Sequence, residues 1–322
     1  MRISLKLIGR CMISCIFVFL TQFALSIVPR FFAASSLLIQ LPLSALLLLV
    51  LLGTGRCCRR FLGVYASAPA FVFFNLLFIW GVYIVILRKV ISPLMGIVLN
   101  GEVAMLIIGL YSILSSDPGF VTSRSSCSDN HAEDSFSEDE AHFEILKTLT
   151  GGTCHEHPTE GSFSSRRVRY CKSCKAYVKG FDHHCPAFGN CIGQKNHVLF
   201  MVLLVGFVIT EASYIMDSFK FATKFQKMDE TGQETSLSEN LVISTMLFCL
   251  LQVLWQGVFL TWHIYCVCVN IRTDEWINWK KYPEFQIIIP IQPGLSSEGR
   301  RFRNPYNKGV FCNMKDFLAS EE

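Results

Sequence analysis

Six long apolar runs constrain this sequence more than any other feature. They cover residues 11–28, 37–53, 71–87, 96–114, 198–216 and 241–266. Each is close to the ~20 residues that a helix needs to cross the hydrocarbon core of a bilayer. Only 17% of the residues are charged, whereas a soluble protein has about a quarter. The sequence therefore predicts an α-helical polytopic membrane protein with about six transmembrane helices.

Basic residues predict which side of the membrane each loop faces. Three follow the second run, and a cluster of six lies within the segment between the fourth and fifth: Arg56, Arg59, Arg60, Arg166, Arg167, Arg169, Lys172, Lys175 and Lys179. Because cytosolic loops carry the excess of lysine and arginine, we expect both termini and the segment between runs four and five in the cytosol. The net charge of +4 suits anionic membrane lipids and requires no nucleic acid.

The first run could be the apolar part of a signal peptide, because three basic residues precede it. No small-residue cleavage site follows it, so we expect it to be retained. The six spans predict an endomembrane location, in the Golgi or the ER, with the plasma membrane as the alternative.

The predicted regions are a membrane region of four spans at 1–114, a turn and linker at 115–153, a cysteine-rich cytosolic domain at 154–197, two spans at 198–269 and a cytosolic tail at 270–322. The linker begins with Asp117-Pro118-Gly119, a turn signal. Its serines and acids at 123–142 are typical of disorder. Glu102 and Glu211 lie within apolar runs, where we expect snorkelling or bonds between helices, with a proton or ion pathway as the alternative.

The cysteine-rich domain contains "YCKSCKAYVKGFDHHCPAFGNC", residues 170–191. In the reducing cytosol such cysteines bind metal or catalyse reactions. A structural zinc takes four ligands, and Cys171 and Cys174 form a knuckle that suits one ion. Cys191 and one histidine complete the set. His183 and His184 are adjacent and point in different directions, so the spacing does not decide between them.

Three residues remain once four ligands are assigned: Cys185, Asp182 and the other histidine. A thiolate is the nucleophilic form of cysteine, and a neighbouring histidine can take its proton. A carboxylate bonded to the imidazole fixes its tautomer. This group indicates nucleophilic catalysis on a frame held by zinc, and a purely structural zinc ribbon is the alternative.

Several motifs resemble one family, the DHHC-type protein S-acyltransferases, or palmitoyltransferases. They are "DHHC" at 182–185, "DPG" at 117–119, "NCIGQKNHVLF" at 190–200, "RTDEW" at 272–276, which is similar to a TTxE motif, and "NPYNKGVFCNMKDF" at 304–317. The resemblance covers about residues 96–317. It implies that Cys185 accepts the acyl group, that His183 is its base and that Asp182 orients the base. It also implies one structural zinc on Cys171, Cys174, His184 and Cys191.

The resemblance further implies the reaction. A long-chain acyl group, with palmitoyl expected, would pass from acyl-CoA to Cys185 and then to membrane-proximal cysteines of substrate proteins. Thr273 would bond the catalytic aspartate, and Asn313 would anchor the tail against the catalytic segment. A catalytically weak or silent membrane scaffold is the alternative.

The chain departs from the family pattern at several positions. Tyr170 and Tyr177 stand where a second zinc site would have a histidine and a cysteine, so we expect one zinc. The alternative is a second site rebuilt from Cys154, His155 and His157. Ala187 replaces a tryptophan, which bears on chain-length preference, and Arg272 replaces the first threonine of TTxE.

Two pairs of cysteines lie near the predicted cytosolic ends of spans. Cys57 and Cys58 precede Arg59, and Cys266 and Cys268 close the last run. Juxtamembrane cysteines are frequent sites of S-acylation. We expect ordinary free thiols at these positions, with acylation as the alternative.

Overall fold

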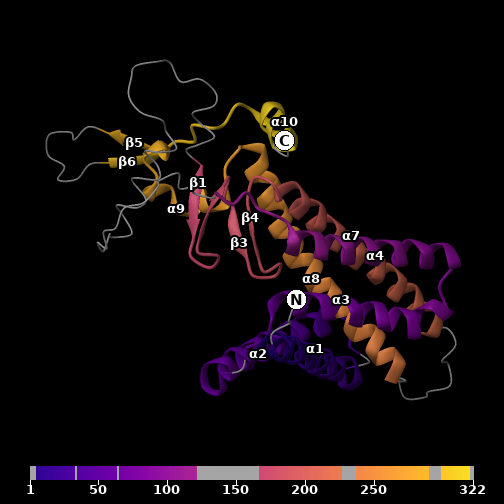
Figure 1. Cartoon of the computed structure of the whole chain (residues 1–322). Coiled ribbons are helices and arrows are strands. Elements are labelled where there is room, and N and C mark those ends of the chain that lie inside the picture. The colour runs from indigo at the N-terminus through magenta and orange to yellow at the C-terminus, as the bar shows by residue number, and fades with distance from the viewer. Residues whose placement is uncertain are drawn as a thin grey trace. The chain divides into compact units, whose positions relative to one another are not determined.

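The computed structural model describes residues 5–32, 35–63, 65–121, 167–226, 237–289 and 299–319. Within them, six helices are long and apolar enough to cross a membrane (Figure 1). They are α1 (Leu5–Phe31), α2 (Leu37–Leu62), α3 (Ala68–Val85), α4 (Pro93–Ser115), α7 (His197–Gln226) and α8 (Leu237–Cys268). The cysteine-rich segment lies in the chain between α4 and α7. The predicted fold class is therefore confirmed. Most of the predicted linker, and the alternative ligands Cys154, His155 and His157, lie outside the described residues.

One compact unit comprises Met1–Ser115, Pro186–Gly189 and Leu199–Ile264. Helix α1 packs against both α2 and α3. The Gln40 side chain of α2 donates hydrogen bonds of 3.0 Å to the carbonyls of Phe32 and Ser35, in the short link after α1. The first two spans are thereby held as a helical hairpin. Buried residues of α1, α3, α4, α7 and α8 and the turn after α3 form a shared core: Leu25, Ile79, Val82, Tyr83, Leu87, Leu99, Tyr214, Phe221, Val242, Phe248 and Cys249.

The two acids within apolar runs are bonded between helices. Ser213 of α7 donates to Glu102 of α4 at 3.0 Å. Gln256 of α8 donates to Glu211 of α7, also at 3.0 Å. Hydrogen bonds of this kind join helices where no water is present. The expectation of bonds between helices is therefore confirmed for Glu102 and Glu211.

The other unit comprises Ser116–Cys185, Asn190–Val198 and Tyr265–Glu322. Strand β1 (Val168–Cys171) pairs with β2 (Ala176–Lys179), and β3 (His183–Cys185) pairs with β4 (Asn190–Ile192), both antiparallel. The tail contains α9 (Thr273–Asn278), the 3₁₀ turns η2 (Trp279–Lys281) and η3 (Pro283–Phe285), the antiparallel pair β5 (Gln286–Ile289) and β6 (Gly299–Phe302), and α10 (Val310–Ala319). Two-stranded pairs this short are marginal alone, so side-chain links or a metal must hold them.

Arg167 supplies one such link, between the start of β1 and the tail. Its guanidinium contacts both carboxylate oxygens of Glu275 at 2.9 Å. It also lies over the ring of Tyr306, 3.8 Å from the centroid. The side chains of Arg167 and Glu275 are only 12% and 2% exposed, and a two-point arginine–carboxylate pair of this kind is stronger than a single contact. Arg169 contacts one carboxylate oxygen of Glu284 at 2.6 Å and lies over the ring of Tyr282, 3.9 Å from the centroid.

Candidate metal centre and active site

Four side chains from three strands and a turn converge in the cysteine-rich segment. The ligand atoms of Cys171, Cys174, His184 and Cys191 all lie within 4.8 Å of one another. The sulfur of Cys174 is 3.4 Å from Nδ1 of His184 and 3.3 Å from the sulfur of Cys191. The sulfur of Cys191 is 3.6 Å from the same nitrogen. A tetrahedral zinc holds such atoms about 3.5 to 3.8 Å apart, so this cluster could hold a metal.

The chemistry of this donor set suits zinc. Burial raises the pKa of the Cys174 thiol, and burial together with the neighbouring thiols of Cys174 and Cys171 raises that of Cys191. Burial, and then the charge of His183, lower the pKa of His184, which favours the neutral imidazole. Buried thiols lose their protons readily only when a cation balances them. Three sulfurs and one neutral imidazole form a common structural zinc set.

The register of β3 and β4 separates the two adjacent histidines. His184 is paired directly with Cys191, whereas His183 is paired with Ile192 and Cys185 with Asn190. Residues directly opposite on paired strands share a face, and neighbours along a strand alternate. His184 therefore faces the cysteine cluster. His183 and Cys185 share the opposite face.

On that opposite face, Asp182 holds the His183 ring. Oδ2 of Asp182 is 2.7 Å from Nδ1 of His183. Asp182 is 0% exposed and Cys185 only 7%. Burial lowers the pKa of His183, but bonds to Asp182 and Cys185 and their negative charges outweigh it, so that its pKa rises to about 9. The carboxylate is thus hydrogen-bonded to the imidazole, whose pKa also responds to the Cys185 thiol on the same face of the strand.

The second oxygen of Asp182 is fixed by the segment after α8. The backbone N–H of Thr273 donates to Oδ1 of Asp182 at 2.9 Å. The N–H of Asp274 donates to the carbonyl of Asp182 at 3.0 Å. The contact predicted for Thr273 is thus made by its backbone at the start of α9, and not by its hydroxyl. Any residue other than proline could make that bond.

Comparison with known proteins adds the family. Residues 156–280 match the family model described as DHHC palmitoyltransferase. The chain carries a DHHC palmitoyltransferase domain. The matched range contains the whole cysteine cluster and the Asp182–His183–Cys185 series, so the predicted family is confirmed.

The curated relatives of this DHHC domain are distant. Palmitoyltransferase ZDHHC17 of Mus musculus is 27% identical over 160 residues, which are 47% of this chain and 24% of that protein. Probable protein S-acyltransferase 1 of Arabidopsis thaliana is 26% identical over 158 residues, 48% of this chain and 40% of that protein. Probable protein S-acyltransferase 15 of the same plant is 24% identical, with 49% and 58% covered. The match therefore spans about a quarter to three fifths of these relatives.

The DPG turn and the asparagine after β4 stabilise the DHHC strands. The side chain of Asp117 accepts the N–H of Gly119 at 2.9 Å and the ammonium of Lys195 at 2.8 Å. The bond from Lys195 is the main reason that the pKa of Asp117 is lowered. Asn196 donates to the carbonyl of Cys191 at 2.9 Å. These contacts fix the segment that follows β4, the strand that carries the last cysteine of the cluster.

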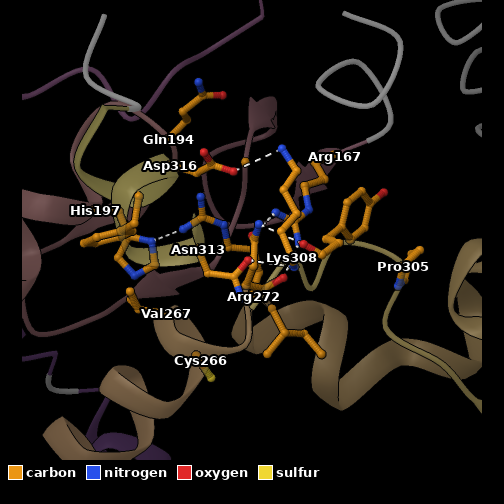
Figure 2. A pocket seen from close by; sticks show the side chains of 15 residues that line it. Arg167, Gln194, His197, Cys266, Val267, Arg272, Pro305, Lys308, Asn313 and Asp316 are labelled. Carbon is orange, nitrogen blue, oxygen red and sulfur yellow. Dashed lines mark hydrogen bonds and ion pairs between the residues drawn. The ribbon is translucent and has the colours of Figure 1, made fainter. Parts of the chain in front are cut away.

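Arg272, which replaces a threonine of the TTxE motif, lies beside a cavity of about 320 Å³. Figure 2 shows its guanidinium directed at the ring of His197, and Nη1 bonds to Nδ1 of that ring. A carboxylate oxygen of Asp182 lies within 4.8 Å of a ring nitrogen of His197, and the charges of Arg272 and Asp182 interact. Sequence reasoning noted Arg272 only as a departure and did not single out His197. The sequence carries no local signal for a contact between residues 75 positions apart.

Asn313 lies on the same cavity and anchors the last helix. It is 1% exposed, and its amide donates to the carbonyl of Cys268 and to the side chain of Asn307, both at 2.8 Å. Its Oδ1 accepts the N–H of Lys308 at 3.0 Å. Asn313 thus ties α10 to the end of α8. The predicted role against the catalytic segment stays a prediction.

Tyr170 and Tyr177 pair directly across β1 and β2, with ring centroids 5.1 Å apart. Cross-strand aromatic pairs stabilise antiparallel strands. At these two positions the DHHC segment therefore has an aromatic contact where the resemblance implies ligands of a second zinc.

Proposed function

We propose that this protein is a protein S-acyltransferase. It would transfer a long-chain acyl group, with palmitoyl the expected one, from acyl-CoA to Cys185 and then to a cysteine of a substrate protein. The observation that supports this proposal best is the division of the DHHC strand into two faces. One face directs His184 into the cysteine cluster, and the other carries Cys185 next to a histidine bonded to a buried aspartate.

In the first step, His183 takes the proton of the Cys185 thiol. The Cys185 sulfur attacks the thioester carbonyl of acyl-CoA, and the bond from that carbon to the CoA sulfur breaks. His183 returns its proton to the leaving CoA thiolate. Asp182, bonded to Nδ1, keeps the proton-accepting nitrogen Nε2 directed at the sulfur and stabilises the imidazolium. The raised pKa of His183, about 9, reflects that stabilisation.

In the second step, a substrate thiol attacks the acyl-Cys185 thioester. His183 takes the proton of that thiol and gives it to the departing Cys185 sulfur, so that the enzyme returns to its initial state. The same imidazole therefore acts in both halves of the reaction. No additional base is required.

A zinc bound by Cys171, Cys174, His184 and Cys191 would have a structural role. It would cross-link β1, β3 and β4, which are too short to be stable without such a link. The reactive thiol of Cys185 is not part of this set. The departure at Tyr170 and Tyr177 favours one zinc per chain.

The membrane spans fit an acyl substrate. A buried acyl chain gains about 0.8 kcal/mol per CH₂ group, so a sixteen-carbon chain remains in the bilayer while its thioester reacts at the surface. Suitable substrates are proteins with cysteines close to the membrane. The basic loops support a cytosolic position for the DHHC segment, and we propose an endomembrane location in the Golgi or the ER.

The test is acyl loading of the purified full chain with alkyne-labelled palmitoyl-CoA, followed by hydroxylamine treatment and peptide mapping. We expect a hydroxylamine-labile label on Cys185 and transfer to an acceptor peptide. Both should be absent in Cys185→Ser and present in Cys312→Ser, which removes an exposed cysteine of α10. Transfer that persists in Cys185→Ser would refute the assignment. A folded, zinc-loaded protein with no loading at all would favour the silent scaffold.

A further inference from the structure

The end of α2 carries two adjacent thiols on an open surface. Cys57 is exposed and Cys58 is partly exposed. From residue 45 to residue 61, no described side chain of α2 is buried. The helix ends at Gly63, whose positive φ of 62° closes the last turn. The two thiols therefore lie in the last turns of a membrane span, where the described part of the chain leaves Cys57 exposed and Cys58 partly exposed.

Positive charge surrounds these thiols and no acid lies nearby in the sequence. Arg56, Arg59 and Arg60 flank them, and the first 101 residues contain no aspartate or glutamate. The start of α1 lies at the same end of the hairpin, because the N–H of Ser67 contacts the Arg10 carbonyl at 3.4 Å. Arginines next to a span attract anionic headgroups. This end of α2 is therefore suited to the lipid interface, where an acyl chain can enter the bilayer.

The thiols lie on the side of the membrane where the proposed acyl donor acts. Within the residues that the structure describes, the membrane-length helices between the end of α2 and the DHHC segment are α3 and α4. Two spans return the chain to the side from which it started. The end of α2 and the DHHC segment lie on the same side of the membrane whether or not α1 crosses it.

Other cysteines are less suitable acceptors. Cys249 and Cys266 are 0% and 1% exposed, so the structure argues against acylation of Cys266. Cys312 is exposed, but it is a single thiol and has no arginine within its helix. The end of α2 combines exposed thiols, flanking arginines and a lipid-facing span.

We infer that Cys57 and Cys58 are an S-acylation site of this chain. The acyl group would come from Cys185 of this same protein. The inference rests on the proposed acyltransferase function. The Cys57 sulfur attacks the carbonyl of the acyl-Cys185 thioester, a new carbon–sulfur bond forms, and the bond to Cys185 breaks. The proton of the Cys57 thiol passes through His183 to the Cys185 sulfur. Cys58 reacts in the same way.

The experiment maps stable acylation on the purified full chain in lipid nanodiscs, using alkyne-labelled palmitoyl-CoA. Peptides containing Cys185 and those containing Cys57 and Cys58 are quantified separately after a chase with unlabelled acyl-CoA. We expect the Cys185 label to turn over and the α2 label to persist. Cys57→Ser/Cys58→Ser should lose at least nine tenths of the persistent label, whereas the matched control Cys312→Ser should lose none.

Cys57→Ser/Cys58→Ser should also load Cys185 and transfer to an acceptor peptide at the wild-type rate, which shows that the variant is folded. Cys185→Ser should gain the α2 label only when active Cys57→Ser/Cys58→Ser protein is added. If Cys185 is labelled but Cys57 and Cys58 are not, this inference is overturned, whereas the proposed function stands. The inference would also be overturned if Cys57 and Cys58 were labelled to the wild-type extent in the Cys185→Ser protein alone. Acyl-CoA would then react with these thiols without the enzyme. No label on Cys185 would overturn the proposed function.

Discussion

Replacing Asp182 with asparagine should nearly abolish acyl loading of Cys185 while leaving the fold intact. Oδ1 of Asp182 accepts the N–H of Thr273 at 2.9 Å, and Oδ2 contacts Nδ1 of His183 at 2.7 Å. An asparagine has one oxygen and one amide nitrogen. Because Thr273 offers a donor, the oxygen must face Thr273. The amide nitrogen then faces His183 and donates to Nδ1, which fixes the proton of the ring on Nε2.

That tautomer cannot act as the base for Cys185, because Nε2 is then a donor. The size of the effect follows from the environment of His183. Its pKa is raised from 6.5 to about 9, and the carboxylate is a main cause. Loss of the carboxylate removes the largest of the contributions that raise this pKa, and the imidazolium loses at most about 3 kcal/mol of preference in this way, because the contribution of Cys185 remains. Burial then lowers the pKa further, and the tautomer change adds its own cost. We expect loading to slow by about 10² to 10⁴-fold.

The assay is single-turnover loading of Cys185 at saturating acyl-CoA, with zinc content and the thermal midpoint measured on the same sample. Zinc content should not change, because the metal cluster lies on the other face of the strand. Asp316→Asn is the matched control, since that carboxylate pairs with Lys308 on the surface of α10 and should leave loading within twofold of the wild type. An Asp182→Asn protein that keeps more than a tenth of the wild-type rate would refute the role given to the Asp182–His183 bond.

Three further outcomes are expected. The wild type should contain one zinc per chain by elemental analysis, and Cys191→Ser should lose it together with a large part of its thermal stability; two zincs in the wild type would contradict this. Arg167→Lys keeps the charge but loses the two-point contact with Glu275, so the free energy of unfolding should fall by about 1–2 kcal/mol in thermal or denaturant unfolding; an unchanged midpoint would count against the contact. Asn313→Ala leaves the Cys268 carbonyl without its donor, at a cost of about 1–3 kcal/mol, and α10 should be cleaved faster in limited proteolysis; wild-type cleavage would show that α10 is held by other contacts.

The membrane part of the fold could be predicted from the sequence because it depends on local composition. A helix in a bilayer satisfies its backbone internally, so an apolar run of sufficient length is enough to indicate each span. The ends of the helices were less well defined. Helix α7 continues to Gln226, ten residues beyond the predicted apolar run, because Asp217 and Lys220 are compatible with a helix that leaves the membrane. Apolar composition marks the span and not the helix.

The choice between His183 and His184 could not be made from spacing. It depends on which residue of β3 lies opposite Cys191, and this register is set by pairing with a strand formed five residues later. The contacts of Arg167 with Glu275 and of Arg272 with His197 join residues 108 and 75 positions apart. No local pattern indicates such pairs, because each is produced when separate segments pack together. Sequence motifs indicated the candidate reacting residues, and only the structure indicates what holds them.

The strand register also makes the metal centre and the reactive thiol dependent on each other. A slip of one residue between paired strands exchanges the two faces of a strand. In β3 such a slip would direct His183 and Cys185 toward the cysteine cluster and His184 away from it, so metal binding and proton transfer would both fail. The bond from Asn196 to the Cys191 carbonyl and a zinc on His184 and Cys191 would both oppose that slip. A metal that takes no part in the reaction would thus still determine which face of β3 turns away from the cluster, and loss of the metal should stop acyl transfer without touching the proposed catalytic residues.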